Sequence, residues 1–496
     1  MAKTLAELAA LVEGARIVGN KDLEIADIEH DSRKIVKGAM FVCMEGVHVD
    51  GHKFIPQARE KGAVAIITRR EMEAPEGMAV LIVPDLKAAL QAIVPYFYDY
   101  PARSMRIIGI TGTNGKTSIS YMVRAMLRAM GCRVGLIGTI QIMIEDQVLP
   151  IHNTTPDVVD LQRTLAAMQK ADMDYVVMEV SSHALDQNRV AGIEFDTAVF
   201  TNLTQDHLDY HGTMENYQKA KTILFDLVSR SGLKQGKTAV VNIDDPAGED
   251  MLSHSRCRHM TYAIHQDAVL KAENIQVLPG GARFDIRIGE KYLPLRLQIT
   301  GIFNVYNVMA AVGAAMAEGV PAPVIRSCME SFASVPGRFE LVRGGQDFSV
   351  IVDYAHTPDG LENILNTARE IAKKRIITVF GCGGDRDNTK RPIMGRIAAR
   401  LSDYVVATSD NPRSEDPQRI LDMVAAGVEE AIGDKPHEYI IDRRKAIFRA
   451  VELAEKDDIV IIAGKGHENY QILHDKTIHF DDKEVALEAI AAKGEK

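Results

Sequence analysis

A glycine-rich segment between an apolar run and a helical pattern constrains this chain more than any other feature. The segment Thr111-Gly112-Thr113-Asn114-Gly115-Lys116-Thr117-Ser118 follows the apolar residues 107–110. A strand, a glycine turn and a helix start in this order direct backbone N–H groups toward one point, which favours phosphate. Lys116 adds a positive charge for the outer phosphates, and the hydroxyl of Thr117 can bind Mg²⁺. The segment therefore predicts a nucleotide site, in a shortened P-loop with Ile110 where the strict pattern has glycine.

The length and composition indicate a multidomain globular protein. At 496 residues the chain is too long for one core, and three domains are expected. The net charge of -10 argues against a nucleic-acid partner, because a phosphate backbone needs a basic face. No apolar run reaches the length of a bilayer span, and residues 1–19 predict a short amphipathic helix rather than a secretory signal. The five cysteines lack close pairs, which indicates a reducing cytoplasm.

Strand and helix patterns divide the chain into three α/β units. Residues 1–98 predict a small α/β domain with one helix around 56–61, and Pro101 is a candidate linker. Residues 99–335 repeat strand then helix, which predicts a mostly parallel sheet covered on both faces. Residues 336–496 again alternate strands and helices and predict a Rossmann-like domain. The glycines of 381–384 do not match the dinucleotide fingerprint, so no nicotinamide cofactor is expected.

Polar residues follow the strands of the central unit. Glu179 comes directly after the apolar run 175–178, and His207 follows the run 198–200. Because ligands gather at the carboxyl ends of parallel strands, both side chains are expected near the P-loop. A single Glu or His is more often structural. Together beside a P-loop, a carboxylate and an imidazole favour a divalent metal site.

Several other residues have two readings on pattern alone. Lys219 and Lys221 lie in a predicted helix over 214–226, where the pattern favours a solvated face. The amides of Asn304 and Asn307 open an alanine-rich helix and could contact a base or cap the helix. Arg413 precedes a helix start at Asp416-Pro417; it can grip a ligand carboxylate, although a solvated loop arginine is the commoner case.

A series of motifs spanning the whole chain resembles the Mur ligases of peptidoglycan synthesis. These motifs are the P-loop segment, Asp31-Ser32-Arg33, Asn153-Thr154-Thr155-Pro156-Asp157, Glu179-Val180-Ser181-Ser182-His183, Asp206-His207-Leu208-Asp209-Tyr210-His211-Gly212, Pro336-Gly337-Arg338 and Asp353-Tyr354-Ala355-His356. Gln187-Asn188-Arg189 and Gly464-Lys465-Gly466-His467-Glu468 fit the member that adds the third amino acid of the peptide. The resemblance implies a UDP-sugar-binding domain (1–98), an ATP-binding domain (99–335) and an amino-acid-binding domain (336–496).

The resemblance also implies a reaction and its site residues. ATP phosphorylates the carboxylate of a UDP-N-acetylmuramoyl dipeptide, and an amine attacks the resulting acyl phosphate, with Mg²⁺ as cofactor. The expected catalytic residues are Lys116, Glu179, His207 and Lys221. The expected metal ligands are Thr117, Glu179, His207 and Lys221. ATP contacts fall to Gly112, Thr113, Asn114, Gly115, Lys116, Thr117, Ser118, Asn304, Asn307, Arg338 and Asp353. The nucleotide-sugar peptide is expected to be bound by Ser32, Asn153, Thr154, Thr155, Ser181, Gln187 and Arg189.

One lysine is expected to be modified. The family carbamylates a lysine that the spacing from His211-Gly212 aligns with Lys221 rather than Lys219. The carbamate, an N6-carboxylysine, is an anion that can approach Mg²⁺, whereas an ammonium would be repelled.

The incoming amino acid is expected to be meso-diaminopimelate rather than lysine. Family members that use it carry Asp-Asn-Pro-Arg, which stands here at Asp410-Asn411-Pro412-Arg413. Diaminopimelate has a second carboxylate that lysine lacks, and the Arg413 guanidinium can pair with it. The resemblance places this amino acid at Arg386, Asp410, Asn411, Pro412, Arg413, Gly464 and Glu468.

Two alternatives remain open at this point. A folylpolyglutamate synthase shares the ATP half of the mechanism but takes a pteridine, and the first domain with Asp31-Ser32-Arg33 argues against it. A regulatory nucleotide-binding protein would hydrolyse ATP slowly without any amine. The ligase itself is expected to be a cytoplasmic monomer without nucleic-acid or membrane partners, and closure of its three domains is expected before chemistry.

Overall fold

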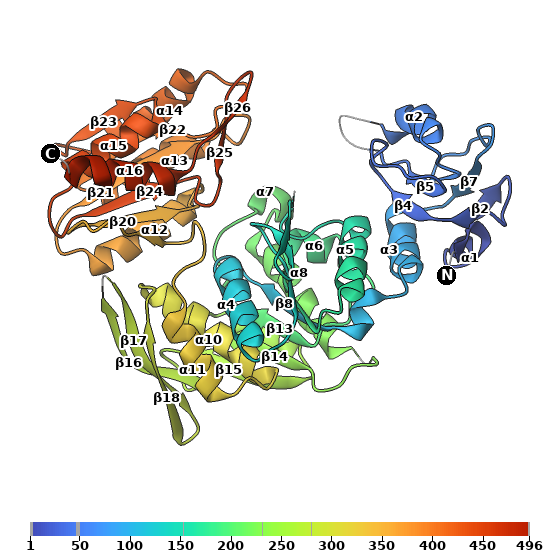
Figure 1. The fold of residues 1–496 in the computed structure, drawn as a ribbon, viewed down its shortest axis with the longest axis horizontal. Helices are drawn as coiled ribbons and strands as arrows, with labels where there is room; N and C mark the ends of the chain where they lie inside the picture. The colour runs from blue at the N-terminus through green and yellow to red at the C-terminus, as the bar shows by residue number, and fades with distance from the viewer. Residues whose placement is uncertain (1–2, 46–49, 152, 231, 279, 495–496) are drawn as a thin grey trace.

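The chain forms three α/β domains arranged in sequence order, with the central domain between the other two (Figure 1). The computed structural model describes residues 3–45, 50–151, 153–230, 232–278 and 280–494. The α/β class and the mostly parallel central sheet agree with the prediction from strand and helix alternation. None of the helices in these ranges combines the length and the apolar character that crossing a bilayer requires.

The first domain is a five-stranded sheet in the order β2-β7-β6-β5-β4 with an antiparallel β2 at one edge. Its elements are β1 (Lys3–Thr4), α1 (Leu5–Ala9), β2 (Arg16–Val18), β3 (Glu24–Ile25), β4 (Asp27–Glu29), β5 (Ala39–Val42), η1 (Gly51–Phe54), α2 (Ile55–Glu60), β6 (Ala65–Thr68), β7 (Ala79–Ile82) and α3 (Leu86–Phe97). The predicted helix over residues 1–19 is wrong in extent: in the described part, the helix covers only α1, where Thr4 and Glu7 form a capping box, and β2 follows.

The central domain carries an eleven-stranded sheet in the order β11-β10-β9-β12-β8-β13-β14-β15-β16-β17-β18. Strands β9 to β16 in this order are parallel, and antiparallel hairpins extend both edges. Its elements are η2 (Pro101–Ser104), β8 (Arg106–Thr111), α4 (Lys116–Ala129), β9 (Val134–Ile137), β10 (Ile142–Ile144), β11 (Gln147–Leu149), α5 (Val158–Lys170), β12 (Tyr175–Glu179), α6 (Ser182–Asp186), β13 (Thr197–Phe200), α7 (Leu208–His211), α8 (Met214–Ser229), β14 (Thr238–Asn242), α9 (Gly248–Ser253), β15 (Arg258–Ala263), β16 (Leu270–Leu278), β17 (Gly281–Ile288), β18 (Lys291–Leu297), α10 (Ile302–Ala317) and α11 (Ala322–Ser331).

The third domain has a six-stranded sheet in the order β19-β20-β24-β21-β22-β23, parallel except for β19. Its elements are β19 (Glu340–Val342), β20 (Ser349–Asp353), α12 (Pro358–Ile371), β21 (Ile376–Cys382), α13 (Lys390–Leu401), β22 (Tyr404–Ser409), α14 (Pro417–Ala431), β23 (His437–Ile440), α15 (Arg443–Leu453), β24 (Ile459–Ala463), β25 (Tyr470–Ile472), β26 (Thr477–His479) and α16 (Asp482–Gly494). Asp416 caps α14 as predicted, since its side chain accepts a hydrogen bond from the N–H of Gln418.

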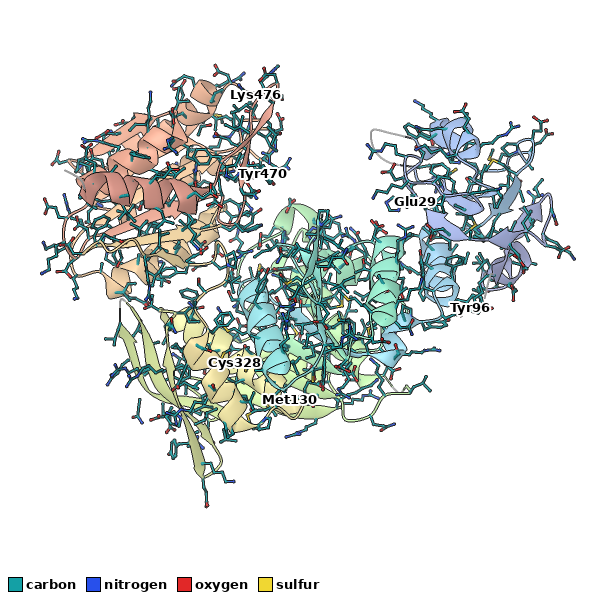
Figure 2. The ribbon with its side chains drawn as sticks, viewed as in Figure 1. Glu29, Tyr96, Met130, Cys328, Tyr470 and Lys476 are labelled. Atoms are coloured by element: carbon teal, nitrogen blue, oxygen red, sulfur yellow. The ribbon has the colours of Figure 1, made fainter. Side chains whose placement is uncertain are left out.

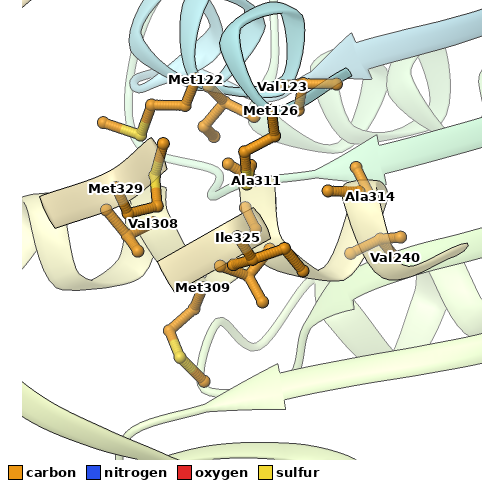
Figure 3. Close-up of a cluster of buried hydrophobic side chains, with 14 of the residues drawn as sticks. Met122, Val123, Met126, Val240, Val308, Met309, Ala311, Ala314, Ile325 and Met329 are labelled. Atoms are coloured by element: carbon orange, nitrogen blue, oxygen red, sulfur yellow. The ribbon is translucent and has the colours of Figure 1, made fainter. Parts of the chain in front are cut away.

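A buried apolar cluster fixes the helix that follows the P-loop. Figure 3 shows Met122 and Met126 of α4 packing toward Val308 of α10 and Met329 of α11. Each such side chain contributes about 1.5–3 kcal/mol when fully buried. The N-termini of α4 and α10 are therefore held beside one another at the carboxyl end of the sheet.

A polar cluster around Arg163 ties the first domain to the central one. Arg163 of α5 donates from Nη2 to the carbonyl of Ile28 at 2.6 Å and pairs through Nη1 with Glu29 at 3.0 Å. Its Nη2 also pairs with Asp27 at 3.2 Å, and Tyr98 donates to Asp27 at 2.8 Å. Glu29 lies on the side of the first domain that faces the centre of the molecule (Figure 2). These contacts cross from one domain to the other and fix their relative position.

Candidate functional site

The glycine-rich segment forms a tight loop between β8 and α4. Gly115 is the N-terminal cap of α4, with a φ of 89°. Its backbone approaches α10 so closely that a Cβ there would stand 2.3 Å from Oδ1 of Asn307. Lys116 folds back, and its Nζ donates to the carbonyls of Gly112 and Thr113 at 2.8 and 2.7 Å. The ammonium is held against the loop, where the phosphates of a nucleotide would lie.

Glu179 at the end of β12 is fully buried beside this loop. Its Oε2 accepts hydrogen bonds from the hydroxyls of Thr117 at 3.1 Å and Thr139 at 2.9 Å. Its Oε1 accepts from the backbone N–H of Thr139 at 2.9 Å. A buried carboxylate is costly unless its oxygens are bonded, and a hard cation suits such oxygens as well as hydroxyls do. Sequence reasoning missed Thr139, although its place just after a parallel strand was a usable signal.

His207 lies in a group of aromatic side chains near the loop. Its ring centroid is 4.8 Å from that of His183 and 5.9 Å from that of Tyr217. Burial, helped by the positive charges of Lys116 and Lys221, lowers the pKa of His207. Burial, with His207 and His211 nearby, lowers the pKa of His183 to about 4. Both imidazoles are therefore neutral at pH 7, which is the form that binds metals.

Lys219 and Lys221 differ sharply in environment although both belong to α8. Lys219 is exposed and pairs with Glu215 at 2.9 Å, as the pattern predicts. Lys221 is 1 % exposed, with Nζ 4.3 Å from the ring centroid of Tyr217, so the predicted solvated face is wrong for this residue. Within the described ranges, its Nζ has neither a hydrogen bond nor a carboxylate partner. Burial and the charge of Lys116 lower the pKa of Lys221 well below its ordinary value.

Asn304 and Asn307 are buried in the first turns of α10. Nδ2 of Asn307 donates to Oδ1 of Asn304 at 3.2 Å, and Nδ2 of Asn304 donates to the carbonyl of Thr300 at 2.8 Å. The amide pair is thus bonded locally, but neither bond accepts from a free backbone N–H at the helix start, so the pair does not cap α10. Oδ1 of Asn307 nevertheless faces Gly115 of the P-loop, so the pair stands beside the nucleotide loop.

Arg338 connects the P-loop to the third domain. Its Nη2 donates to Oγ1 of Thr117 at 3.4 Å, and its Cζ lies 5.1 Å from the ring centroid of Tyr354. Tyr354 in turn contacts the ring of His467, with centroids 4.9 Å apart. Asp353 is tied down locally: its carboxylate accepts from the N–H groups of Phe339 and Ala355 at 2.6 and 2.8 Å. Burial raises the pKa of Asp353.

A cleft of about 510 Å³ lies between the first and central domains. Gln187 and Arg189 line it, together with Arg69, Lys87 and Gln91, which sequence reasoning missed. These three could not be found from their spacing, because only the packing of the two domains brings them to the cleft.

The other residues expected to hold the sugar peptide are not among those that line this cleft. Oγ of Ser32 donates to Gln57 at 2.7 Å. Asn153 is exposed, and Oγ1 of Thr154 lies 3.1 Å from that of Thr139. Thr155 contacts both neighbouring sites: its hydroxyl donates to the carbonyl of Glu179 at 2.9 Å, and its own carbonyl accepts from Arg189 at 3.0 Å. Ser181 caps α6.

The residues expected to hold the amino acid gather at the carboxyl ends of β22 and β24. Glu468 accepts from Nδ2 of Asn411 at 2.8 Å and from Nζ of Lys465 at 3.1 Å. Oδ2 of Asp410 is buried without a hydrogen-bond partner in the described ranges, and a Cβ at Gly464 would stand 2.7 Å from it. Tyr470, near Lys465, lies on the edge of the third domain that faces the middle of the molecule (Figure 2).

Three further residues of this set occupy the adjoining loops. Pro412 is buried and Arg413 is half-buried, with Nη1 of Arg413 donating to the carbonyl of Gly384 at 2.8 Å. Arg386 is exposed on the loop after β21, where its Nη1 donates to the carbonyl of Asp385 at 2.9 Å. The loops after β21, β22 and β24 therefore meet at one place.

The domain order and the geometry agree with comparisons to known proteins. Family models match residues 24–98 (Mur ligase family, catalytic domain), 110–315 (Mur ligase middle domain) and 337–466 (Mur ligase, glutamate ligase domain). A relative from Bacillus licheniformis is 48% identical, over 95% of this chain and 96% of its own. The chain belongs to the Mur ligase family. The relative is a UDP-N-acetylmuramoyl-L-alanyl-D-glutamate--2,6-diaminopimelate ligase.

Two further members of the Mur ligase family bear the same name. The one from Bacillus cereus is 46% identical, over 96% of this chain and 96% of its own. A solved structure is 32% identical and covers 100% of both chains with a TM-score of 0.69. The fold and the family relationship thus extend over the whole length of this Mur ligase.

The close approach of Gly115 to α10 gives a testable prediction. Gly115→Ala combines a strained positive φ with a contact to Asn307, whereas Gly131→Ala has a φ of 92° and open space around its Cβ. Gly131→Ala is expected to cost about 1–2 kcal/mol of stability from backbone strain alone. Gly115→Ala should cost more and should also weaken nucleotide binding, as measured by thermal unfolding with and without ATP. Equal effects of the two variants would mean that the loop tolerates a side chain.

Proposed function

We propose that this Mur ligase joins meso-diaminopimelate to UDP-N-acetylmuramoyl-L-alanyl-D-glutamate in an ATP-dependent reaction. The curated relatives with 46% and 48% identity carry this activity in their names. The observation that carries the proposal is the meeting of two sites through Arg338, which links the P-loop residue Thr117 to the third-domain loop containing His467. A phosphorylated carboxylate at the first site can thereby meet an amine held at the second.

The chemistry follows from the need to activate a carboxylate. ATP transfers its γ-phosphoryl group to the D-glutamate carboxylate, which gives an acyl phosphate and ADP. The amine nitrogen then attacks the acyl carbon, the C–O bond to phosphate breaks, and the nitrogen loses a proton as the amide forms. Positioning and charge neutralisation dominate such transfers. Lys116 at the P-loop supplies positive charge, and Thr117 and Glu179 would hold the Mg²⁺ that binds the phosphates.

Mg²⁺ fits the residues around Glu179. The buried carboxylate and the hydroxyl of Thr117 are hard oxygen donors only 3.1 Å apart, and His207 stands nearby with a neutral ring. When bound, the cation would neutralise the phosphate charge. Lys221 would join this set as a carbamate, because its buried nitrogen makes no hydrogen bond in the described structure and a carbamate adds two oxygens.

The proposed roles of the three domains follow the sites that they carry. The cleft with Arg69, Lys87, Gln187 and Arg189 supplies cations and amides for the UDP-sugar peptide between residues 1–98 and the central domain. Residues 99–335 carry the ATP site and residues 336–496 the amino-acid site. The five cysteines are all free, in line with a reducing cytoplasm, and we propose that the enzyme works there as a monomer.

A product assay tests the proposal directly. The protein is incubated with ATP, UDP-N-acetylmuramoyl dipeptide and equal amounts of lysine and diaminopimelate, and the products are resolved by mass spectrometry. We expect the dipeptide mass to increase by one diaminopimelate residue, and ADP release to require both the dipeptide and the amino acid. Faster turnover on lysine would reverse the amino-acid assignment. ATP hydrolysis that ignores the amine would favour a regulatory nucleotide-binding protein, and turnover of a folate instead would favour a folylpolyglutamate synthase.

A further inference from the structure

Arg391 is a fully buried cation behind the proposed amino-acid site. It lies in the first turn of α13 and is 1 % exposed. Its Nη1 and Nη2 bind the two carboxylate oxygens of Glu415 at 2.9 and 2.8 Å, and Nη2 also donates to the carbonyl of Gly383 at 3.2 Å. Such a two-pronged pair fixes direction as well as distance. One guanidinium therefore joins α13, the loop after β21 and the loop after β22.

The two loops joined by Arg391 are also bonded to each other. The N–H of Gly384 donates to the carbonyl of Asn411 at 2.9 Å, and the hydroxyl of Ser414 donates to Asp385 at 2.7 Å. The backbones lie so close that a Cβ at Gly384 would stand 1.9 Å from the carbonyl oxygen of Pro412. The loops can therefore move only together.

Arg413 takes its position from this paired structure. Its Nη1 donates to the carbonyl of Gly384 at 2.8 Å, one residue beyond the carbonyl that Arg391 holds. Its backbone has a φ of 53°, which is costly for a residue with a side chain and persists only where the surroundings impose it. Both the backbone and the guanidinium of Arg413 thus depend on where the two loops are held.

We propose that Arg391 and Glu415 are positioning residues that set the selectivity for diaminopimelate by aiming Arg413. This inference rests on the proposed function. Neither side chain needs to touch the substrate: Arg391 is buried behind the loops, and Glu415 is engaged by Arg391 and by the N–H of Asp385. Lysine in place of Arg391 would keep the positive charge but lose the bidentate contact. An ammonium is a point charge that cannot hold both carboxylate oxygens of Glu415 and the Gly383 carbonyl in one plane.

The variants Arg391→Lys and Glu415→Gln test the proposal, with Arg396→Lys as a matched control. Arg396 lies on the same helix but pairs with Glu430 near the end of α14, at 2.7 Å, rather than with Glu415 of the loop. We expect the KM for diaminopimelate to rise by about 10- to 100-fold in the first two variants, because small misplacements of a binding group have effects of this size. The KM values for ATP and the UDP dipeptide should change by less than about twofold.

The selectivity between diaminopimelate and lysine separates a positioning role from a purely structural one, which would leave this selectivity unchanged. The ratio of kcat/KM for diaminopimelate to that for lysine should fall in Arg391→Lys and Glu415→Gln and stay constant in Arg396→Lys. Unchanged selectivity in folded variants would overturn the proposal. A parallel rise of the KM values for diaminopimelate, ATP and the UDP dipeptide, together with a loss of thermal stability, would also overturn it. Glu415→Gln keeps the test valid if Arg391→Lys does not fold, and failure of both to fold would assign the pair to stability alone. If the wild-type protein does not turn over diaminopimelate, it is the proposed function that fails.

Discussion

Lys221→Ala is expected to lower the rate of ligation by about 10²- to 10³-fold, the range found when one preorganised group is removed from an active site. Lys221 is buried beside Tyr217 and near Lys116, and its nitrogen makes no hydrogen bond in the described structure. A carbamate there would place an anion between cationic groups, so its loss would leave the phosphates and the metal poorly held. The measurement is single-turnover formation of the tripeptide product at saturating substrates.

The matched control for Lys221 is Lys219→Ala on the same helix. Lys219 is exposed and paired with Glu215, and exposed pairs of this kind contribute little to stability because solvent screens them. We expect its rate to stay close to that of the wild type. Depletion of carbon dioxide should slow the wild type, with recovery on adding bicarbonate, and should not affect Lys221→Ala. Equal ligation rates for Lys221→Ala and Lys219→Ala would show that Lys221 has no role in the reaction.

Arg413→Ala is expected to lower kcat/KM for diaminopimelate by about 10²- to 10³-fold, because removing one partner of a desolvated charge pair costs about 3–5 kcal/mol. The half-buried Arg413 can pair with the second carboxylate of this amino acid. Lysine lacks that carboxylate, so kcat/KM for lysine should change little. The ratio of kcat/KM for diaminopimelate to that for lysine should therefore fall. ATP binding, followed by thermal stabilisation, should be retained.

Arg419→Ala serves as the control for Arg413. Arg419 is exposed on α14, just beyond the same loop. Its removal is expected to leave both the rate and the amino-acid preference unchanged. If Arg413→Ala behaves like Arg419→Ala, Arg413 is a solvated loop residue and the amino-acid preference has another source.

The local pattern of the chain predicted the P-loop and the neighbourhood of Glu179. A strand, a glycine turn and a helix are defined within a few residues, and parallel strands bring their polar ends to one edge. Both features depend on short-range chemistry and a general rule of sheets. The predicted alternation of strands and helices likewise matches the parallel part of the central sheet.

Features that depend on packing between distant segments were not predictable. The burial of Lys221 is not one of these features, because helical spacing places it on one face of α8 with Tyr217, Leu224 and Phe225, so the predicted solvated face could have been rejected from the sequence. The cations Arg69 and Lys87 reach the cleft through the docking of two domains. The helix α3 and the hairpin β17–β18 were missed although they carry local signals, since Asp85 caps α3 and Gly289 stands at the turn of the hairpin.

The cluster around Arg163 has a consequence for inhibitor design. Because Asp27 and Glu29 on one side and Arg163 on the other already hold the first two domains together, the 510 Å³ cleft exists without any rearrangement. A compound shaped to this cleft would bind a ready-made receptor and lose little affinity to reorganisation.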